Sequence, residues 1–173
     1  GTFRSGLINS CLFCSTKFLK MALLAGKVAL ITGGSRGIGQ AIVEEYVKQG
    51  ASVAFTYVSD SSKEKSESLA SSLGTSAQQM KAYKSNAANF QEAASLIDQV
   101  MADYGRIDIL INNAGITRDT LMLRMSEEQW DEVINTNLKS VFNLTKHILK
   151  PMLKQRSGSI IHMSSVVGVF GNA

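Results

Sequence analysis

Short runs of aliphatic and β-branched residues alternate with stretches of helix-like periodicity over most of the chain, beginning at Lys27. Runs that are almost entirely apolar, such as 28–31 and 107–111, predict strands buried on both faces. In all, the pattern predicts five strands, over residues 28–31, 52–57, 79–84, 107–111 and 159–163. Strands that alternate with helices are typical of a parallel sheet covered on both faces, so we expect an α/β fold with a doubly wound sheet.

Between the strands, apolar residues recur at the three- to four-residue spacing of amphipathic helices. This spacing predicts helices over residues 38–47, 66–73 and 90–104. A glycine follows each of them, and glycine readily takes the left-handed conformation that ends a helix: Gly50, Gly74 and Gly105.

A longer helix is predicted from Ser126 onward. Ser126 and Gln129 have the spacing of a capping box, in which each side chain bonds the backbone N–H of the other residue. The apolar periodicity then continues past Phe142 toward Pro151. Because proline lacks the N–H of a regular helix and its ring crowds the preceding turn, we expect a kink or an end at Pro151.

The composition is that of a globular protein. The 173 residues are 45% apolar and 18% charged, which supplies enough apolar side chains for one core, so we expect a single domain over residues 21–173. A single proline and the lack of low-complexity tracts exclude collagen-like and disordered classes. No apolar run approaches the roughly 18 residues of a membrane span, so we expect a soluble protein without a membrane partner.

The net charge of +4 is concentrated at the start of the chain. Three basic residues and no acidic ones fall within residues 1–20, which leaves 15 basic and 14 acidic side chains for the rest. A body so nearly neutral lacks the electrostatic footprint of a nucleic-acid-binding protein, and we expect no nucleic acid as partner.

Residues 1–20 differ from the body and also contain both cysteines, Cys11 and Cys14. A C-x-x-C pair can be a redox centre or half of a metal site, but the strand and helix that usually flank such a pair are missing, and we predict no metal site. We expect a disordered leader, either an organellar transit peptide or sequence ahead of a true start at Met21. A body without cysteine fits a reducing compartment, so we expect a cytoplasmic protein, or an organellar one if the leader is a transit peptide.

A glycine-rich turn directly follows the first predicted strand and opens the first helix. Glycines let the backbone turn tightly and approach a pyrophosphate, whose charge the helix N-terminus attracts. Between a strand and a helix, such a turn indicates a dinucleotide site, although glycines that merely tighten a turn would give the same letters. The candidate cofactor-binding residues are Thr32, Gly33, Ser35, Arg36, Gly37, Ile38 and Gly39.

The second strand indicates which dinucleotide binds. Sites selective for NADH usually place an acidic residue at its end, where the acid bonds the ribose 2′-hydroxyl and would repel a 2′-phosphate. Here the corresponding place, around Thr56, is neutral, and Arg36 in the glycine turn can pair with a phosphate through its planar guanidinium. We therefore expect NADPH as cofactor, unless Arg36 is simply a solvated surface charge.

These motifs together resemble the short-chain dehydrogenase/reductase family over Leu24–Ala173. The resemblance rests on T-G-x-x-x-G-I-G, on Asn112-Asn113-Ala114-Gly115 after the fourth strand, on Asn137, and on Ser164-Ser165 after the fifth strand. The segments 115–119 and 164–168 are similar to those of the 3-oxoacyl-acyl-carrier-protein reductases of fatty acid biosynthesis. The resemblance implies a Rossmann-like sheet, and reduction of a carrier-bound 3-oxoacyl group by hydride transfer from NADPH.

The resemblance also implies further cofactor contacts. Asn112, Ala114 and Gly115 match the family segment that borders the cofactor ribose, while Asn86 and Ala87 match a loop that contacts the adenine. Many relatives have aspartate at the position of Asn86, and either side chain can accept a hydrogen bond from the adenine amino group.

Two catalytic residues follow from the same resemblance, Asn137 and Ser165. Asn137 shares a predicted helical face with apolar residues, where its side-chain amide must find hydrogen-bond partners. One interpretation is structural, with nearby backbone groups as these partners. The other follows from the resemblance, because the matching residue in the family helps hold a water of the proton relay. Ser165 matches the serine that hydrogen-bonds the substrate carbonyl oxygen. Ser164 points to the other side of the strand, and we interpret His162 as structural.

The family's proton donor, a tyrosine followed four residues later by a lysine, has no counterpart here. None of the tyrosines has a lysine at that spacing, and all precede Ser165: Tyr46, Tyr57, Tyr83 and Tyr104. We therefore expect an N-terminal fragment, truncated after the fifth strand and inactive by itself, of an enzyme that is a homo-oligomer, a tetramer, when complete.

The expected partner is an acidic acyl carrier protein. Lys154 and Arg156 match a region where the family docks the carrier, although charges at the end of a helix are also commonly just solvated. Two alternatives stay open: a short-chain reductase of free carbonyl substrates, and a non-catalytic truncated module that binds NADPH or a full-length partner.

Overall fold

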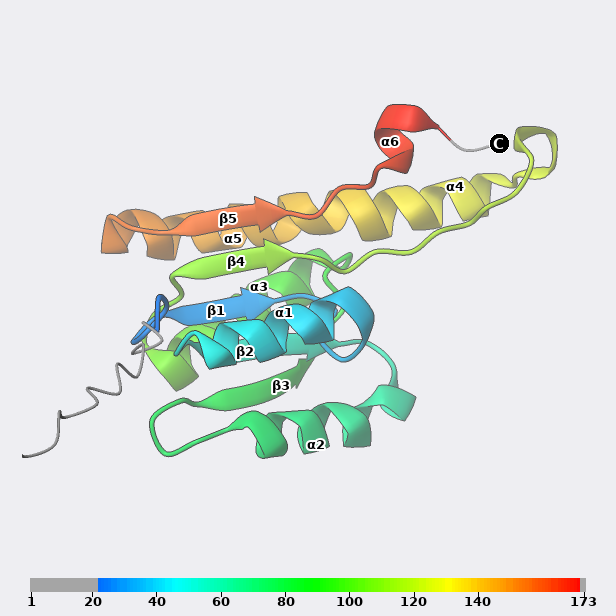
Figure 1. The fold of residues 1–173 in the computed structure, drawn as a ribbon. Helices are drawn as coiled ribbons and strands as arrows, with labels where there is room; N and C mark the ends of the chain where they lie inside the picture. Colours follow the sequence, from blue (N-terminus) through cyan, green and yellow to red (C-terminus); the bar gives the residue numbers. More distant parts are fainter. Residues whose placement is uncertain (1–21, 172–173) are drawn as a thin grey trace, which may run out of the picture.

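The computed structural model describes residues 22–171, which are built around one sheet of five parallel strands (Figure 1). The strand order is β3-β2-β1-β4-β5. The chain therefore moves outward from β1 to β3 and then returns to the other side of β1, which is the doubly wound arrangement expected from the sequence. The strands are β1 (Val28–Ile31), β2 (Ser52–Tyr57), β3 (Met80–Lys84), β4 (Ile109–Asn112) and β5 (Ser159–His162).

Helices cover both faces of this sheet, as the pattern predicts (Figure 1). On one face lie α1 (Gly37–Lys48) and α2 (Lys63–Leu73), the latter preceded by the short 3-10 turn η1 (Asp60–Ser62). On the other face lie α3 (Phe90–Tyr104) and α5 (Ser140–Gln155). Gly50, at φ +93°, follows the end of α1, and Gly105, at φ +74°, caps α3. Gly74 also ends its helix, α2, but in an extended rather than a left-handed conformation, at φ −63°.

The alternation of side chains along each strand produces two apolar cores, one on each face. Ile31 and Phe55 point toward α1 and α2, whereas Leu30 and Leu110 point toward α3 and α5. All four are at most 2% exposed, and each such side chain stabilises the fold by about 1.5–3 kcal/mol. Burial on both faces explains why these strands contain no polar alternation.

The long helix after Ser126 is divided into three parts. The capping box of Ser126 and Gln129 begins α4 (Glu127–Ile134), as expected, and η2 (Met122–Arg124) precedes it. Wider π-helical turns, η3 (Asn135–Lys139), then lead into α5. Of the two outcomes expected at Pro151, an end of the helix is wrong, because α5 continues to Gln155 and is ended by Arg156 in the left-handed conformation, at φ +54°.

Some element boundaries differ from the prediction for local reasons. The fourth strand begins at Ile109 rather than at residue 107, because the amide of Ile107 donates to Gln155 Oε1 instead of joining the ladder. The second helix begins three residues early, at Lys63, with a polar first turn that apolar periodicity does not detect. After β5, the short α6 (Val167–Phe170) ends the described part.

Among residues 22–171, no helix combines the length and apolar composition needed to cross a membrane. In the same range, no group of three or more His, Cys, Asp and Glu side chains is arranged to hold a metal ion. The predictions for the leader and for Cys11 and Cys14 lie outside the described residues.

Candidate functional site

The candidate residues gather where the parallel strands end. The loops after β1, β4 and β5 all leave the sheet at the C-terminal ends of the strands (Figure 1). Between β1 and β4 the order of the strands reverses, because β2 and β3 are added on one side of β1 and β4 and β5 on the other. In open α/β sheets, ligands bind at such a reversal, because the two diverging loops leave a crevice between them.

Thr32 joins the two central loops. It is 1% exposed, and its hydroxyl donates to the carbonyl of Ile111 at 3.4 Å while accepting from the amides of Asn113 and Ala114, both at 2.9 Å. The Asn113 side chain returns the connection by donating to the carbonyls of Thr32 and Gly33 at 3.0 and 3.3 Å. The glycine turn and the loop after β4 are therefore held as one rigid unit.

Two glycines of the turn are required by its geometry. Gly33 has φ +66° and lies so close to the loop after β4 that an added Cβ would be 3.2 Å from the Ala114 Cα. At Gly39, an added Cβ would collide with the carbonyl oxygen of Gly33. Any side chain at Gly39 would push α1 away from the turn, so this glycine sets how closely the helix start approaches it.

Thr56 stabilises the turn from β2. Its hydroxyl accepts from the amide of Gly33 at 3.2 Å, and its carbonyl accepts from the amide of Gly34 at 3.1 Å. The side chain is 3% exposed, so its hydroxyl contacts the glycine turn rather than solvent. Val58, two residues later, is 56% exposed. The end of β2 remains neutral, but the surface that a ribose phosphate would meet there begins after Thr56.

The N-terminus of α1 is open toward this edge. Arg36 is its N-cap residue, makes no side-chain cap, and is followed by a first turn without acidic residues. Gly37 has φ +55° and open space where a Cβ would lie, while Ser35 is buried and Ile38 is 66% exposed. Within the described residues, the Arg36 guanidinium has no ion-pair partner. Uncapped N–H groups beside a cation suit a phosphate, so these residues fit a dinucleotide.

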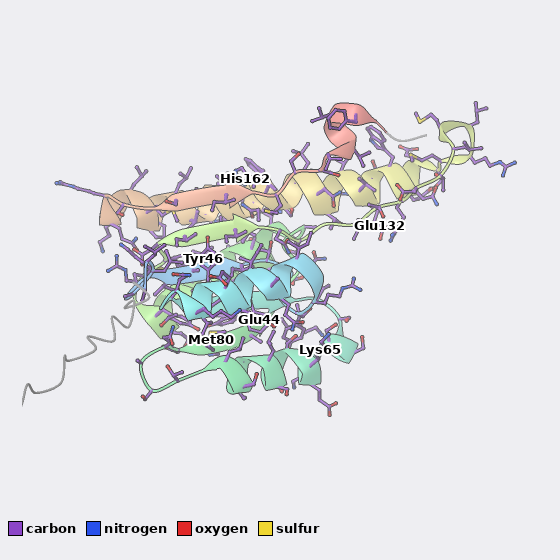
Figure 2. All side chains as sticks on the ribbon, in the orientation of Figure 1. Glu44, Tyr46, Lys65, Met80, Glu132 and His162 are labelled. Atoms are coloured by element: carbon purple, nitrogen blue, oxygen red, sulfur yellow. The ribbon has the colours of Figure 1, made fainter. Side chains whose placement is uncertain are left out.

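Asn112 ends β4 as a buried amide with an unused acceptor. Its Nδ2 lies 3.0 Å from Nδ1 of His162 on β5, the residue labelled in Figure 2, while its Oδ1 has no partner in the described structure. The contact with Asn112 fits the structural role expected of His162. The free Oδ1 of Asn112 fits a residue that accepts a hydrogen bond from a bound group.

The loop between β3 and α3 contains the expected adenine contacts. The side chain of Asn86 is already used, because its Oδ1 accepts from the amide of Ala88 at 3.0 Å, although an amide oxygen can accept a second bond. Ala87 is 7% exposed and its side chain belongs to the core beside α3 and α5. A ligand at this loop would therefore meet Ala87 through its backbone.

Asn137 lies within the π-helical turns of η3. Its Oδ1 accepts from the amide of Ile116 and its Nδ2 donates to the carbonyl of Ile116, both at 2.8 Å. Gly115 leaves room for this pair, since an added Cβ would lie 3.3 Å from Asn137 Oδ1. Nearby backbone thus satisfies the amide, and Asn137 joins the helix to the loop after β4.

Ser165 follows β5 at the same edge and is exposed. Its hydroxyl accepts from the amide of Val167 at 3.3 Å as α6 begins, and Ser164 is also exposed. Of the candidate residues, those of the glycine turn, β2 and the loop after β4 are joined by hydrogen bonds, and Asn137 is joined to them through Ile116. Ser165 shares the edge with them.

None of the tyrosines lies beside Ser165. Tyr46 lies on α1, on a different element from β5, where His162 lies (Figure 2). Burial, together with the hydrogen bond to Asp103, raises the pKa of Tyr83, and burial also raises the pKa of Tyr46 and Tyr104. A raised pKa makes a phenol a poorer proton donor at neutral pH, so these side chains suit structural roles.

Lys154 and Arg156 lie at the opposite edge of the sheet. The strands are parallel and α5 runs back against them, so its last turn lies where the strands begin, next to Ser159 at the start of β5 (Figure 1). Both side chains are exposed. A partner bound there would face the edge away from the glycine turn.

Comparisons with known proteins agree with the motifs. A family model described as short chain dehydrogenase matches residues 27–173. The chain is 46% identical over 146 residues to a 3-oxoacyl-acyl-carrier-protein reductase of Staphylococcus aureus, which covers 84% of this chain and 58% of the relative. It is also 46% identical over 149 residues to the enzyme of that name from Thermotoga maritima, covering 86% of this chain and 59% of the relative.

A third relative with the same name, from Salmonella typhimurium, is 43% identical over 148 residues, which cover 86% of this chain and 58% of the relative. The chain therefore spans a little under three fifths of the length of these relatives. The matched part includes the glycine turn, the loop after β4 and Asn137.

Proposed function

The chain belongs to the short-chain dehydrogenase family, and from that premise we propose that it provides the cofactor site of an NADPH-dependent reductase. The reaction is the reduction of 3-oxoacyl-acyl-carrier-protein to 3-hydroxyacyl-acyl-carrier-protein in fatty acid biosynthesis, the activity that gives the relatives their name. One observation carries the proposal: the uncapped N-terminus of α1, reached through a tight glycine turn and flanked by the exposed Arg36.

Each part of the dinucleotide has residues to hold it. The amides that follow the glycine turn bind the pyrophosphate, and Arg36 pairs with the 2′-phosphate that distinguishes NADPH from NADH. The unpaired Oδ1 of Asn112 and the backbone of Ala114 and Gly115 border the ribose of the nicotinamide half. The loop at Asn86 and Ala87 borders the adenine.

Ser165 would meet the carbonyl of a bound substrate, because it lies at the same end of the strands as the residues that would hold the cofactor. When bound, NADPH supplies the hydride that reduces the 3-oxo carbon. The hydroxyl of Ser165 donates a hydrogen bond to the oxygen on which negative charge develops, and such bonds strengthen as the charge grows. Asn137 positions the loop after β4 through Ile116, and its place in the π-helical turns suits the holding of a water that passes a proton.

We propose that the proton donor is none of the tyrosines in this sequence, because all four lie on elements other than β5 and the loop that follows it. Burial also raises the pKa of Tyr46, Tyr83 and Tyr104, which suits structural roles. This chain by itself then binds NADPH without turning over a substrate. Titration calorimetry tests the first half of that statement, and NADPH consumption followed at 340 nm in the presence of a 3-oxoacyl thioester tests the second.

Cofactor choice is tested through Arg36. Replacing Arg36 with alanine should weaken NADPH binding about 10-fold or more while leaving NADH binding nearly unchanged, since only NADPH has the 2′-phosphate. Lys63→Ala, which also removes an exposed cation on this face, is the matched control. An unchanged ratio of NADPH to NADH affinity in Arg36→Ala would remove the basis for NADPH, and wild-type protein that binds neither dinucleotide would reject the cofactor site.

We further propose that Lys154 and Arg156 dock the acidic carrier and that the complete enzyme is a homo-oligomer, a tetramer. An apolar groove of about 610 Å³ along α5, bordered by residues such as Leu138 and Phe142, supports the oligomer. Arg156→Glu in the complete enzyme should raise the KM for carrier-bound substrate and leave the KM for a free thioester unchanged. Equal effects on both substrates would reject the docking role.

A further inference from the structure

Asn143 is a completely buried amide in the middle of α5. It is 0% exposed and belongs to the face of the helix that packs against α3. Its Nδ2 donates two hydrogen bonds, to the carbonyl of Ala87 at 2.9 Å and to the carbonyl of Ala88 at 3.1 Å. These bonds connect residues more than fifty positions apart in the sequence, so Asn143 holds the β3–α3 loop from across the sheet face.

The loop bonds the amides of Asn86, Ala88 and Asn89 locally, the last of them to the carbonyl of Asn86, whereas the carbonyls of Ala87 and Ala88 accept from Asn143. The amide of Asn86 donates to Glu92 at 2.8 Å, and the amide of Ala88 donates to the side chain of Asn86. Asn89 then caps α3 by accepting from the amides of Gln91 and Glu92. Those contacts are local, whereas the bonds from Asn143 set where the loop lies relative to the rest of the protein.

The next turn of α5 reinforces the same attachment. The ring of His147, four residues after Asn143, packs edge-on against Phe90, with ring centroids 4.5 Å apart. Phe90 is the first residue of α3, directly after the loop. The loop and the start of α3 are therefore fastened to α5 at two successive turns.

We infer that Asn143 is a positioning residue for the adenine half of the cofactor, an inference that rests on the function proposed above. The exposed side of the loop, at Asn86, is the part expected to meet the adenine, and Asn143 fixes that loop from its buried side. A displacement of the backbone by about 1 Å is enough to weaken a well-oriented contact strongly.

The chemistry of the site requires asparagine. The carbonyl oxygens of Ala87 and Ala88 both face the NH2 group of Asn143. Aspartate has an oxygen in place of this NH2 group, so its carboxylate would repel both carbonyl oxygens. Leucine has nearly the same shape but donates nothing, and would leave two buried carbonyls without these bonds. Asn143→Leu therefore removes the attachment with the least change in volume.

The test compares the two halves of the cofactor. Adenosine 2′,5′-bisphosphate and nicotinamide mononucleotide are titrated separately into the whole 173-residue chain by calorimetry. Asn143→Leu should bind the adenosine bisphosphate about 10-fold more weakly and the mononucleotide with unchanged affinity. The matched control is Gln155→Leu. It also removes side-chain hydrogen bonds from α5 to backbone, here those to the amide and carbonyl of Ile107, but at the opposite end of the strands.

The outcomes separate the inference from the proposed function. If Asn143→Leu binds the adenosine bisphosphate as tightly as Gln155→Leu does, Asn143 is a structural residue and the inference fails while the cofactor site stands. If the wild-type chain binds neither half nor NADPH, the proposed function and the inference fail together.

A measurement on the wild-type chain covers the case in which Asn143→Leu does not fold. In ¹⁵N-labelled protein, the side-chain amide signals of Asn143 should shift on saturation with the adenosine bisphosphate and stay in place with the mononucleotide. Signals that stay in place with both compounds would overturn the inference without any variant.

Discussion

The two edge strands of the sheet are built in different ways. On β3, the exposed Lys81 and Lys84 form ion pairs with Asp103 and Asp60, at 2.7 and 2.6 Å. On β5, no side chain is charged, and apolar groups meet water: Ile161 is 41% exposed, and Met163, just after the strand, is 45% exposed. Lysines on an edge strand discourage another strand from pairing with it, whereas an apolar edge invites contact.

The helices follow the same division. The helices beside β3 bury their apolar faces, but the side of η3 and α5 beyond β5 leaves large apolar residues in contact with water. Among them are Leu138 in η3, at 63% exposed, and Phe142 and Leu153 in α5, at 56% and 73%. Exposed apolar side chains that are contiguous mark an interaction surface. The contrast indicates that β3 is built as a solvent-facing edge strand, and it supports the interface proposed above for the β5 side.

The largest expected effect compares the same substitution on the two sides. Phe55→Ala, in the core beneath α1, should lower the free energy of unfolding by about 3–5 kcal/mol, because it leaves a cavity among fully buried side chains. Phe142→Ala should cost less than about 1 kcal/mol, because most of that ring already meets water. Urea unfolding measures both, and equal losses would mean that the β5 side is covered in solution.

The next largest effect on stability should come from Asp108, which joins the central strands β1 and β4. Asp108, 4% exposed at the start of β4, accepts from the amide of Val28 on β1 at 3.0 Å and forms two hydrogen bonds with Arg106. Asp108→Asn should lower the free energy of unfolding at pH 7 by about 1–3 kcal/mol, since it removes the negative charge beside Arg106 and replaces one of the two acceptor oxygens with a donor.

Asp108 should also make the stability of the protein depend on pH in the acidic range. Burial raises the pKa of Asp108, but the bonds from Arg106 and Val28 outweigh it, so the pKa lies below its ordinary value of 3.8. The stabilisation is thus complete above pH 3.8 and is lost as the pH falls through the lowered pKa. Urea midpoints should fall more steeply below pH 3.8 for the wild type than for Asp108→Asn, and parallel curves would contradict this assignment.

A smaller effect is expected from the apolar surface itself. Leu138→Gln should lower the fluorescence of bound anilinonaphthalene sulfonate by about a third to a half, because the dye binds exposed apolar groups such as those lining the groove. Lys150→Gln, on α5 and also exposed, should leave the fluorescence unchanged. Equal dye binding in both variants would show that the groove does not attract apolar ligands.

The smallest effect should come from the ion pairs of the edge strand β3. Lys84→Ala removes the exposed pair with Asp60, and solvent screening makes such pairs weak. The urea midpoint should stay within experimental error, whereas Lys84→Leu should increase light scattering on heating by making β3 resemble β5. A marked loss of stability in Lys84→Ala would mean that this edge depends on its ion pairs.

The sequence predicts the sheet well because burial dominates its strands. Residues 28–31 are apolar throughout, and residues 107–111 are apolar apart from Asp108. Only a strand covered on both faces explains such runs in a chain with helices between them. The π-helical turns at 135–139 were not predicted, since their apolar spacing resembles that of an α-helix. An end at Pro151, one of the two expected outcomes, is not observed, because one lost hydrogen bond near a helix end costs little when the flanking residues Ile148 and Met152 are buried.

The candidate site was predictable where chemistry requires a local motif, as in the glycine turn. Roles that depend on distant contacts were not. Thr56 bonds Gly33, which lies 23 residues away, and Asn113 bonds Thr32 from 81 residues away, so no local pattern reveals either contact. Asn113 stands inside the motif that indicated the site, but the letters alone could not show that it closes the turn. Asn143 gave no signal beyond a polar residue on an apolar helix face.

The pairing of β1 with β4 has a consequence for synthesis of the chain. The central strand leaves the ribosome first, but its register with β4, Ala29 opposite Ile109, requires a partner eighty residues later. At about 5–20 residues per second, one side of β1 waits roughly 4–16 seconds for its neighbour. During that interval, the hydrophobic edge of β1 is open to chaperones or to aggregation, so the rate of translation past residue 112 should influence the yield of folded protein.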